Sequence, residues 1–205
     1  MHTVSLRSRR IVVWLLVVSL LLAAFPGVAL GQAPAHANAV ERALGWLASQ
    51  QAPDGSYGDS ASMTIEAVLA QTAARRDVSA ALGYLAEQAE GYTTDAGATG
   101  KLLTAVSMAG ADPRAFGSMN LVEHLNGQLA DTPPEEMTAI AAAWSLLGLR
   151  AAGEALPAKL VKSLVDLQQT NGGWEWGPGY GTDSNTTAFV LQALLAARVE
   201  KAVLT

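Results

Sequence analysis

The sequence predicts an all-α fold made of tandem helical hairpins, and three observations support this prediction. Half of the 205 residues are hydrophobic and only 15% are charged, which is enough apolar material for a domain with its own core. A unit of roughly 40 residues recurs along the chain. Each copy combines a stretch that is apolar on one helical face with a stretch that is apolar on all faces.

The first 31 residues have the pattern of a secretory signal peptide. Arg7, Arg9 and Arg10 precede an apolar run over 11–25, and residues 29–31 form a small-x-small cleavage site. We expect cleavage after this site, because the run is shorter than the ~20 residues of a membrane span. A retained anchor is the alternative, and it is the only membrane contact that we expect. Residues 32–205 are therefore predicted to be secreted or held at the cell surface.

Composition excludes several classes of site. The chain has no cysteine, so disulfides, thiolate metal sites and cysteine nucleophiles are ruled out. Its three histidines are scattered, and its net charge of -5 does not suit a nucleic-acid surface. We therefore expect no metal site, no cofactor and no nucleic-acid partner.

Four repeats divide residues 32–205. The segment Ala43–Gln50 recurs as Ala81–Gln88, with six of eight positions identical, and more weakly at 121–128. A fourth copy, Lys159–Trp174, aligns with Arg42–Tyr57. The repeats lie near 38–75, 77–110, 118–150 and 157–198.

Each repeat is predicted to contain an outer and an inner helix. The stretch 157–169 has one apolar face, whereas 140–149 and 188–197 carry no charge at all. We therefore expect the second helix of each pair to be buried on every side, and Pro133–Pro134 to open the sixth helix. The expected helices are 38–51, 61–75, 77–89, 97–109, 118–130, 135–150, 157–169 and 184–198.

The segment Arg42–Tyr57 resembles the QW repeat of the prenyltransferase and squalene-cyclase superfamily. That repeat has a basic, a small, an aromatic and an aliphatic residue, followed by Gln, Gly and Trp. Lys159–Trp174 is similar, although Leu160 and Ser163 replace the small and aromatic residues. The resemblance implies an α/α toroid, here an incomplete, open toroid of about four helix pairs. It also implies that Gln51, Gln168 and the following rings are structural.

The catalytic sets of that superfamily are not found in this sequence. The nearest match to the Asp-x-Asp-Asp acid motif of the cyclases is Asp183–Thr186, which has an amide at the acid position. The zinc site of the prenyltransferases needs a cysteine. We therefore expect a non-catalytic member and assign no catalytic residue.

One long turn before the last helix is the richest candidate binding site. We name residues 174–183 the aromatic loop, because it combines three aromatic rings with two carboxylates. The Tyr57 turn, residues 55–60, has a similar composition. Two structural interpretations stay open: the acidic residues before helices (Asp59, Asp95 and Asp183) cap them, and Trp174 only anchors its turn. The candidate ligand-binding residues are Trp174, Glu175, Trp176, Tyr180, Asp183, Asn185, Tyr57 and Asp59.

The predicted function is a non-catalytic binding or interaction module. Its ligand would be a small molecule or glycan, and fold analogy makes a corrinoid one candidate. The alternative is an enzyme: a degenerate terpene cyclase, or a carbohydrate-active lyase or hydrolase that uses Glu175 and Asp183 of the aromatic loop.

An open toroid leaves apolar inner faces uncovered, so we expect self-association. Purified residues 32–205 should dimerise or aggregate in light scattering. A sharp monomer peak, together with no binding of a dye that reports apolar surface, would contradict this expectation.

Overall fold

The computed structural model describes residues 37–198, and these form eight α-helices, one short 3₁₀ helix and no β-strand. The predicted signal peptide and its cleavage site lie outside the described residues. No helix within them is long and apolar enough to cross a membrane. The helices are α2 (Ala37–Ser49), α3 (Ala61–Ala73), α4 (Ser79–Tyr92), α5 (Ala96–Met108), α6 (Leu121–Asp131), η1 (Pro134–Glu136), α7 (Ala139–Ala151), α8 (Ala158–Asp166) and α9 (Ser184–Ala196).

The chain divides into two units within α2, between Gly45 and Trp46. In the first unit the structure describes only residues 37–45, which are helical. The second unit contains α3 to α9.

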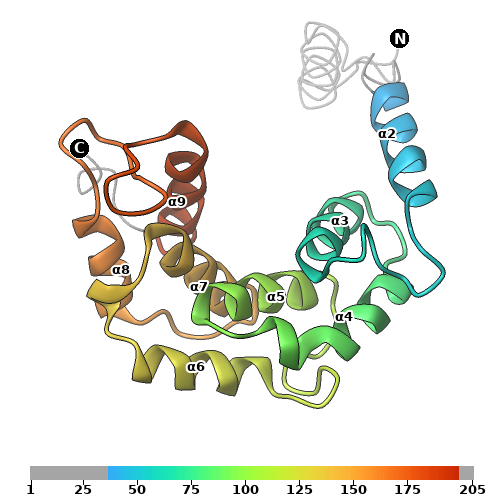
Figure 1. Cartoon of the computed structure of the whole chain (residues 1–205), viewed down its shortest axis with the longest axis horizontal. Helices are drawn as coiled ribbons and strands as arrows, with labels where there is room; N and C mark the ends of the chain where they lie inside the picture. Colours follow the sequence, from blue (N-terminus) through green and yellow to red (C-terminus); the bar gives the residue numbers. More distant parts are fainter. Residues whose placement is uncertain (1–36, 199–205) are drawn as a thin grey trace, which may run out of the picture. The chain divides into compact units, whose positions relative to one another are not determined.

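The helices of the second unit form an inner and an outer row. The inner helices pack in chain order, α3 on α5, α5 on α7 and α7 on α9 (Figure 1). The outer helices α4, α6 and α8 each pack mainly on the inner helix that precedes them, α3, α5 and α7. The all-α prediction is confirmed. Each outer helix packs mainly on the inner helix before it, and not on the inner helix that the sequence repeat pairs it with.

Side-chain caps fix where the inner helices begin. The side chains of Ser60, Asp95, Thr138 and Asp183 each accept a hydrogen bond from the backbone N–H three residues ahead. Capping by Asp95 and Asp183 is thus confirmed. Capping by Asp59 is wrong, because its backbone is left-handed (φ 49°) and the next residue is the cap.

The predicted start of the sixth helix is also wrong. Pro134–Glu136 form the separate 3₁₀ helix η1, and α7 begins only after the Thr138 cap. Proline suits a first helical turn, but here that turn is not continued. The η1 segment is therefore a separate turn that precedes α7 and does not extend it.

Burial distinguishes the two rows. Helix α5 buries nine of its 13 residues, whereas α4 buries only Ala81, Leu85 and Ala89, a single stripe. The expectation that α9 is buried on every side is wrong, because Leu191 and Leu195 are 36% and 66% exposed. Helix α9 is last in the inner row, so among the described helices it has one inner neighbour. These two leucines are apolar surface of the kind that self-association would use.

Helices α5 and α7 approach until their main chains touch. A side-chain carbon added at Gly100 would lie 2.5 Å from the carbonyl oxygen of Trp144, and one added at Gly148 would lie 2.5 Å from that of Gly100. The hydroxyl of Ser145 donates to the carbonyl oxygen of Ala96 at 3.0 Å. Small residues at this crossing therefore set the distance between the two helices.

The two matching Gln-containing turns use the same bonds. The side-chain amide nitrogens of Gln51 and Gln168 donate to the carbonyl oxygens of Gly55 and Gly172, at 3.1 and 2.8 Å. The backbone N–H of each aromatic residue, Tyr57 and Trp174, donates to a threonine hydroxyl on the next inner helix at 2.9 Å. These bonds agree with the structural role that the sequence predicts for the glutamines and rings.

Substituting Gly100→Ala should destabilise the protein by about 1–3 kcal/mol, because the new methyl group overlaps main-chain atoms of α7. Gly83→Ala in α4 is the matched control. A methyl group there meets nothing within 4 Å, so it should stabilise by up to about 1 kcal/mol. Chemical denaturation of both variants tests this, and equal effects of one sign would contradict the close crossing.

Candidate functional site

The aromatic loop is held in one conformation by its own polar groups. The Glu175 carboxylate accepts hydrogen bonds from the backbone N–H groups of Gly179 and Gly181, at 3.0 and 3.1 Å. The side-chain amide of Asn171 donates to the Thr182 hydroxyl at 2.7 Å. An isolated antiparallel bridge joins Glu175 to Thr182 across the base of the loop. Glu175 therefore organises the loop.

The three rings of this loop have different environments. Trp174 is fully buried, and its indole N–H donates to the carbonyl oxygen of Leu164 at 2.8 Å. Trp176 and Tyr180 are 55% and 76% exposed, and their rings meet edge to face with centroids 5.3 Å apart. Trp174 thus has the contacts of a packing anchor, whereas Trp176 and Tyr180 offer aromatic surface to a partner.

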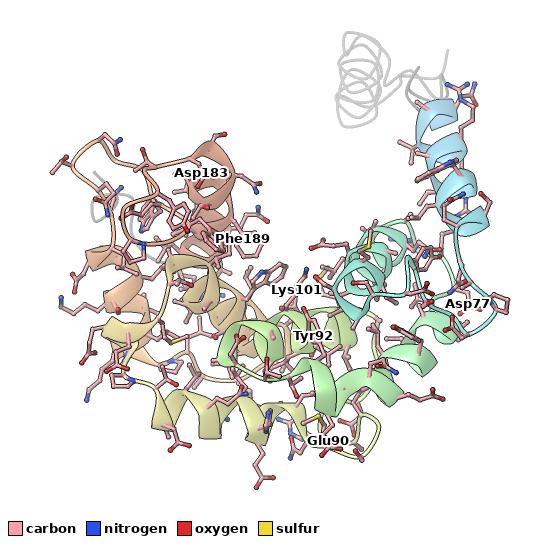
Figure 2. The ribbon with its side chains drawn as sticks, in the orientation of Figure 1. Asp77, Glu90, Tyr92, Lys101, Asp183 and Phe189 are labelled. Atoms are coloured by element: carbon pink, nitrogen blue, oxygen red, sulfur yellow. The ribbon has the colours of Figure 1, made fainter. Side chains whose placement is uncertain are left out.

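The remaining predicted residues are spread over two places. Asp183 caps α9, and Asn185 is exposed on the first turn of that helix (Figure 2). Tyr57 is buried, with its hydroxyl accepting from the Gln71 side chain at 2.8 Å, and Asp59 is exposed. The Tyr57 turn precedes α3 and the aromatic loop precedes α9, so α5 and α7 stand between the two turns.

A cleft that the sequence analysis missed lies between the two turns. It has a volume of about 670 Å³ and is bounded by the first turns of α3, α5 and α7, the ends of α4 and α6, and η1. We name it the α5–α7 cleft. Asp95 is the only candidate carboxylate from the sequence that lines it.

A partly buried lysine that lines this cleft connects the inner helices. The Lys101 side chain is 13% exposed, and its ammonium lies 2.7 Å from a Glu66 carboxylate oxygen and 3.0 Å from the Ser62 hydroxyl, both on α3. The same ammonium lies 5.6 Å from the ring centre of Trp144 on α7. Trp144 in turn packs on Phe189 of α9, with ring centres 4.2 Å apart (Figure 2).

The polar groups at the cleft mainly accept hydrogen bonds. Asp95, Asp131 and Glu136 contribute carboxylates, and the one lysine is already paired with Glu66. The carbonyl oxygen of the Gln128 side chain is buried and has no hydrogen-bond partner among the described residues. The cleft thus suits a ligand that donates hydrogen bonds or carries positive charge.

Tyr92 adds a hydrogen-bond donor to the lining of the α5–α7 cleft. Burial raises the pKa of its hydroxyl, and the charges of Asp95 and Glu66 raise it further, while a hydrogen bond with Ser62 opposes the shift. The phenol therefore stays protonated at neutral pH.

A smaller pocket of about 180 Å³ lies between η1 and the aromatic loop. Glu175, Gly177 and Pro178 line one side of it. Glu136, Met137 and Thr138 line both this pocket and the α5–α7 cleft. The η1 segment is therefore a common wall, and it brings the predicted loop next to the unpredicted cleft.

Within residues 37–198 no three side chains of the metal-binding types come together. Comparisons with known protein families, curated proteins and solved structures give no match for this chain.

The contribution of the Asp183 cap to the stability of the protein should depend on pH. Its pKa is lowered, chiefly by the hydrogen bond from the Thr186 backbone N–H, so the cap stabilises the fold above the ordinary value of 3.8. This contribution should disappear as the pH falls through the lowered pKa. The stability difference between the wild type and Asp183→Ala should therefore be largest near neutral pH and shrink in acid, as measured by denaturation at several pH values.

Asp183→Asn should keep most of the stability, because asparagine also caps helices, and should show no such pH dependence. A pH-independent difference between wild type and Asp183→Ala would argue against the cap.

Proposed function

We propose that this chain is a secreted, non-catalytic binding module of the open α/α toroid type, and that it binds carbohydrate in the α5–α7 cleft. The observation that carries the proposal is the acceptor-rich lining of that cleft. The predicted signal peptide supports export, and the Gln-containing turns support the likeness to QW repeats.

Carbohydrate fits the cleft because sugars supply hydroxyl donors. The exposed carboxylates of Asp131 and Glu136 can accept from such hydroxyls. Tyr92 and Trp144 add aromatic surface for the C–H faces of a sugar ring. The volume of about 670 Å³ lies within the range of ligand pockets.

The net negative charge of the cleft favours one kind of sugar. Three carboxylates line it, and its lysine is balanced by Glu66. An amino sugar adds Coulomb attraction to its hydroxyl bonds, so glucosamine units should bind more tightly than neutral ones. An isoprenoid diphosphate, the ligand that the resemblance would suggest, meets like charge there.

The enzyme alternative loses support at the aromatic loop. Glu175 accepts from two loop N–H groups, and Asp183 accepts from the first turn of α9. The hydrogen bonds that lower the pKa of Asp183 also make it a poor proton donor. Both carboxylates therefore have a structural role as acceptors of backbone hydrogen bonds.

Calorimetric titration of the full chain with glucosamine oligomers and with neutral oligosaccharides of equal length tests the proposal. Glucosamine oligomers should bind more tightly, and added salt should reduce the difference. Asp131→Asn and Glu136→Gln should each weaken binding about tenfold or more, the scale of a charged hydrogen bond. Glu87→Gln, an exposed charge on the outer helix α4, is the matched control and should change nothing.

Two results would contradict the proposal. The first is a thermal shift with a corrinoid or an isoprenoid and none with any carbohydrate. The second is chain shortening of the oligosaccharide that is lost in Asp183→Asn, which would establish the enzyme alternative.

A further inference from the structure

We propose that the ligand is an oligosaccharide chain and that it runs from the α5–α7 cleft across η1 to the rings of Trp176 and Tyr180. This inference rests on the proposed function, because it takes carbohydrate binding in the cleft as given. It adds a second contact area and predicts that affinity depends on chain length.

The surface is continuous between the two pockets. They share Glu136, Met137 and Thr138, of which Glu136 and Thr138 are exposed and Met137 is buried. The smaller pocket ends at Gly177 and Pro178, directly after Trp176 in the chain. A linear ligand that leaves the cleft over η1 therefore reaches the aromatic loop without crossing a helix of the core.

The aromatic loop holds its exposed rings in fixed positions through its own contacts. Trp176 and Tyr180 expose most of their surface although large rings are usually buried, and they hold each other edge to face. The Glu175 carboxylate accepts hydrogen bonds from Gly179 and Gly181, the residues on either side of Tyr180. A loop that is already ordered loses little conformational entropy on binding. Little of the free energy gained from contact with a sugar face is therefore lost to ordering the loop.

The side chains between the cleft and the aromatic loop can form hydrogen bonds with a sugar chain. The exposed Glu136 carboxylate accepts from sugar hydroxyl or amino groups at the middle of the path. The hydroxyl of Thr138 accepts a backbone N–H at 3.3 Å, which leaves its own hydrogen to donate. Aromatic surface thus occurs at both ends of the path, Tyr92 and Trp144 in the cleft and Trp176 and Tyr180 on the loop, with polar groups between them, which suits successive sugar units.

The experiment compares glucosamine dimers and hexamers by calorimetric titration on the full chain. The hexamer should bind at least tenfold more tightly than the dimer. Trp176→Ala should weaken hexamer binding about three- to tenfold, the range of one aromatic contact, and leave dimer binding unchanged. Trp176→Phe should restore most of the loss. Met108→Ala, which removes an exposed apolar side chain at the opposite end of α5, should affect neither ligand.

Three results would overturn the inference. Equal affinity for dimer and hexamer would show that nothing outside the cleft contributes. Unchanged hexamer binding in Trp176→Ala would place the additional contacts elsewhere. An equal loss for both lengths would put the dimer itself on the aromatic loop. If neither oligomer binds, the proposed function fails, and this outcome is distinct from the other three.

Discussion

The close crossing of α5 and α7 is the contact on which the rest of the second unit depends. At Gly100 and Gly148 the two main chains touch, and no side chain lies between them. Packed interiors deform little, so this crossing sets the spacing of the two helices along their length. Because the first turns of both helices line the α5–α7 cleft, the crossing also sets the width of the cleft.

A second set of contacts extends this rigidity along the inner row. Lys101 joins α5 to α3 through Glu66 and lies against Trp144 of α7, which packs on Phe189 of α9. An ion pair next to an aromatic ring is weak support by itself, but it leaves the partly buried ammonium compensated. Lys101 therefore both holds α5 against α3 and lines the α5–α7 cleft, where the exposed Glu136 carboxylate also lies.

The fold followed from periodicity, whereas the site did not. The spacing of apolar residues and the caps predicted each helix to within a few residues, and failed at η1 because two prolines suggested a continuous start. The aromatic loop was recognised from its composition, since its rings and carboxylates are adjacent in sequence. The cleft joins five helices and η1, so no local pattern marks it. One sequence feature could have pointed to the cleft: Lys101 is the only charged residue of the otherwise uncharged helix α5.

Hydrogen exchange of backbone amides, measured with and without a glucosamine hexamer, tests most directly whether the inner helix ends hold the ligand. First-turn amides of a helix exchange readily because they lack intrahelical partners. We expect slower exchange on ligand addition within 94–101 and 136–144, and little change within 116–125. Protection confined to other segments, or no protection by a hexamer that demonstrably binds, would contradict it.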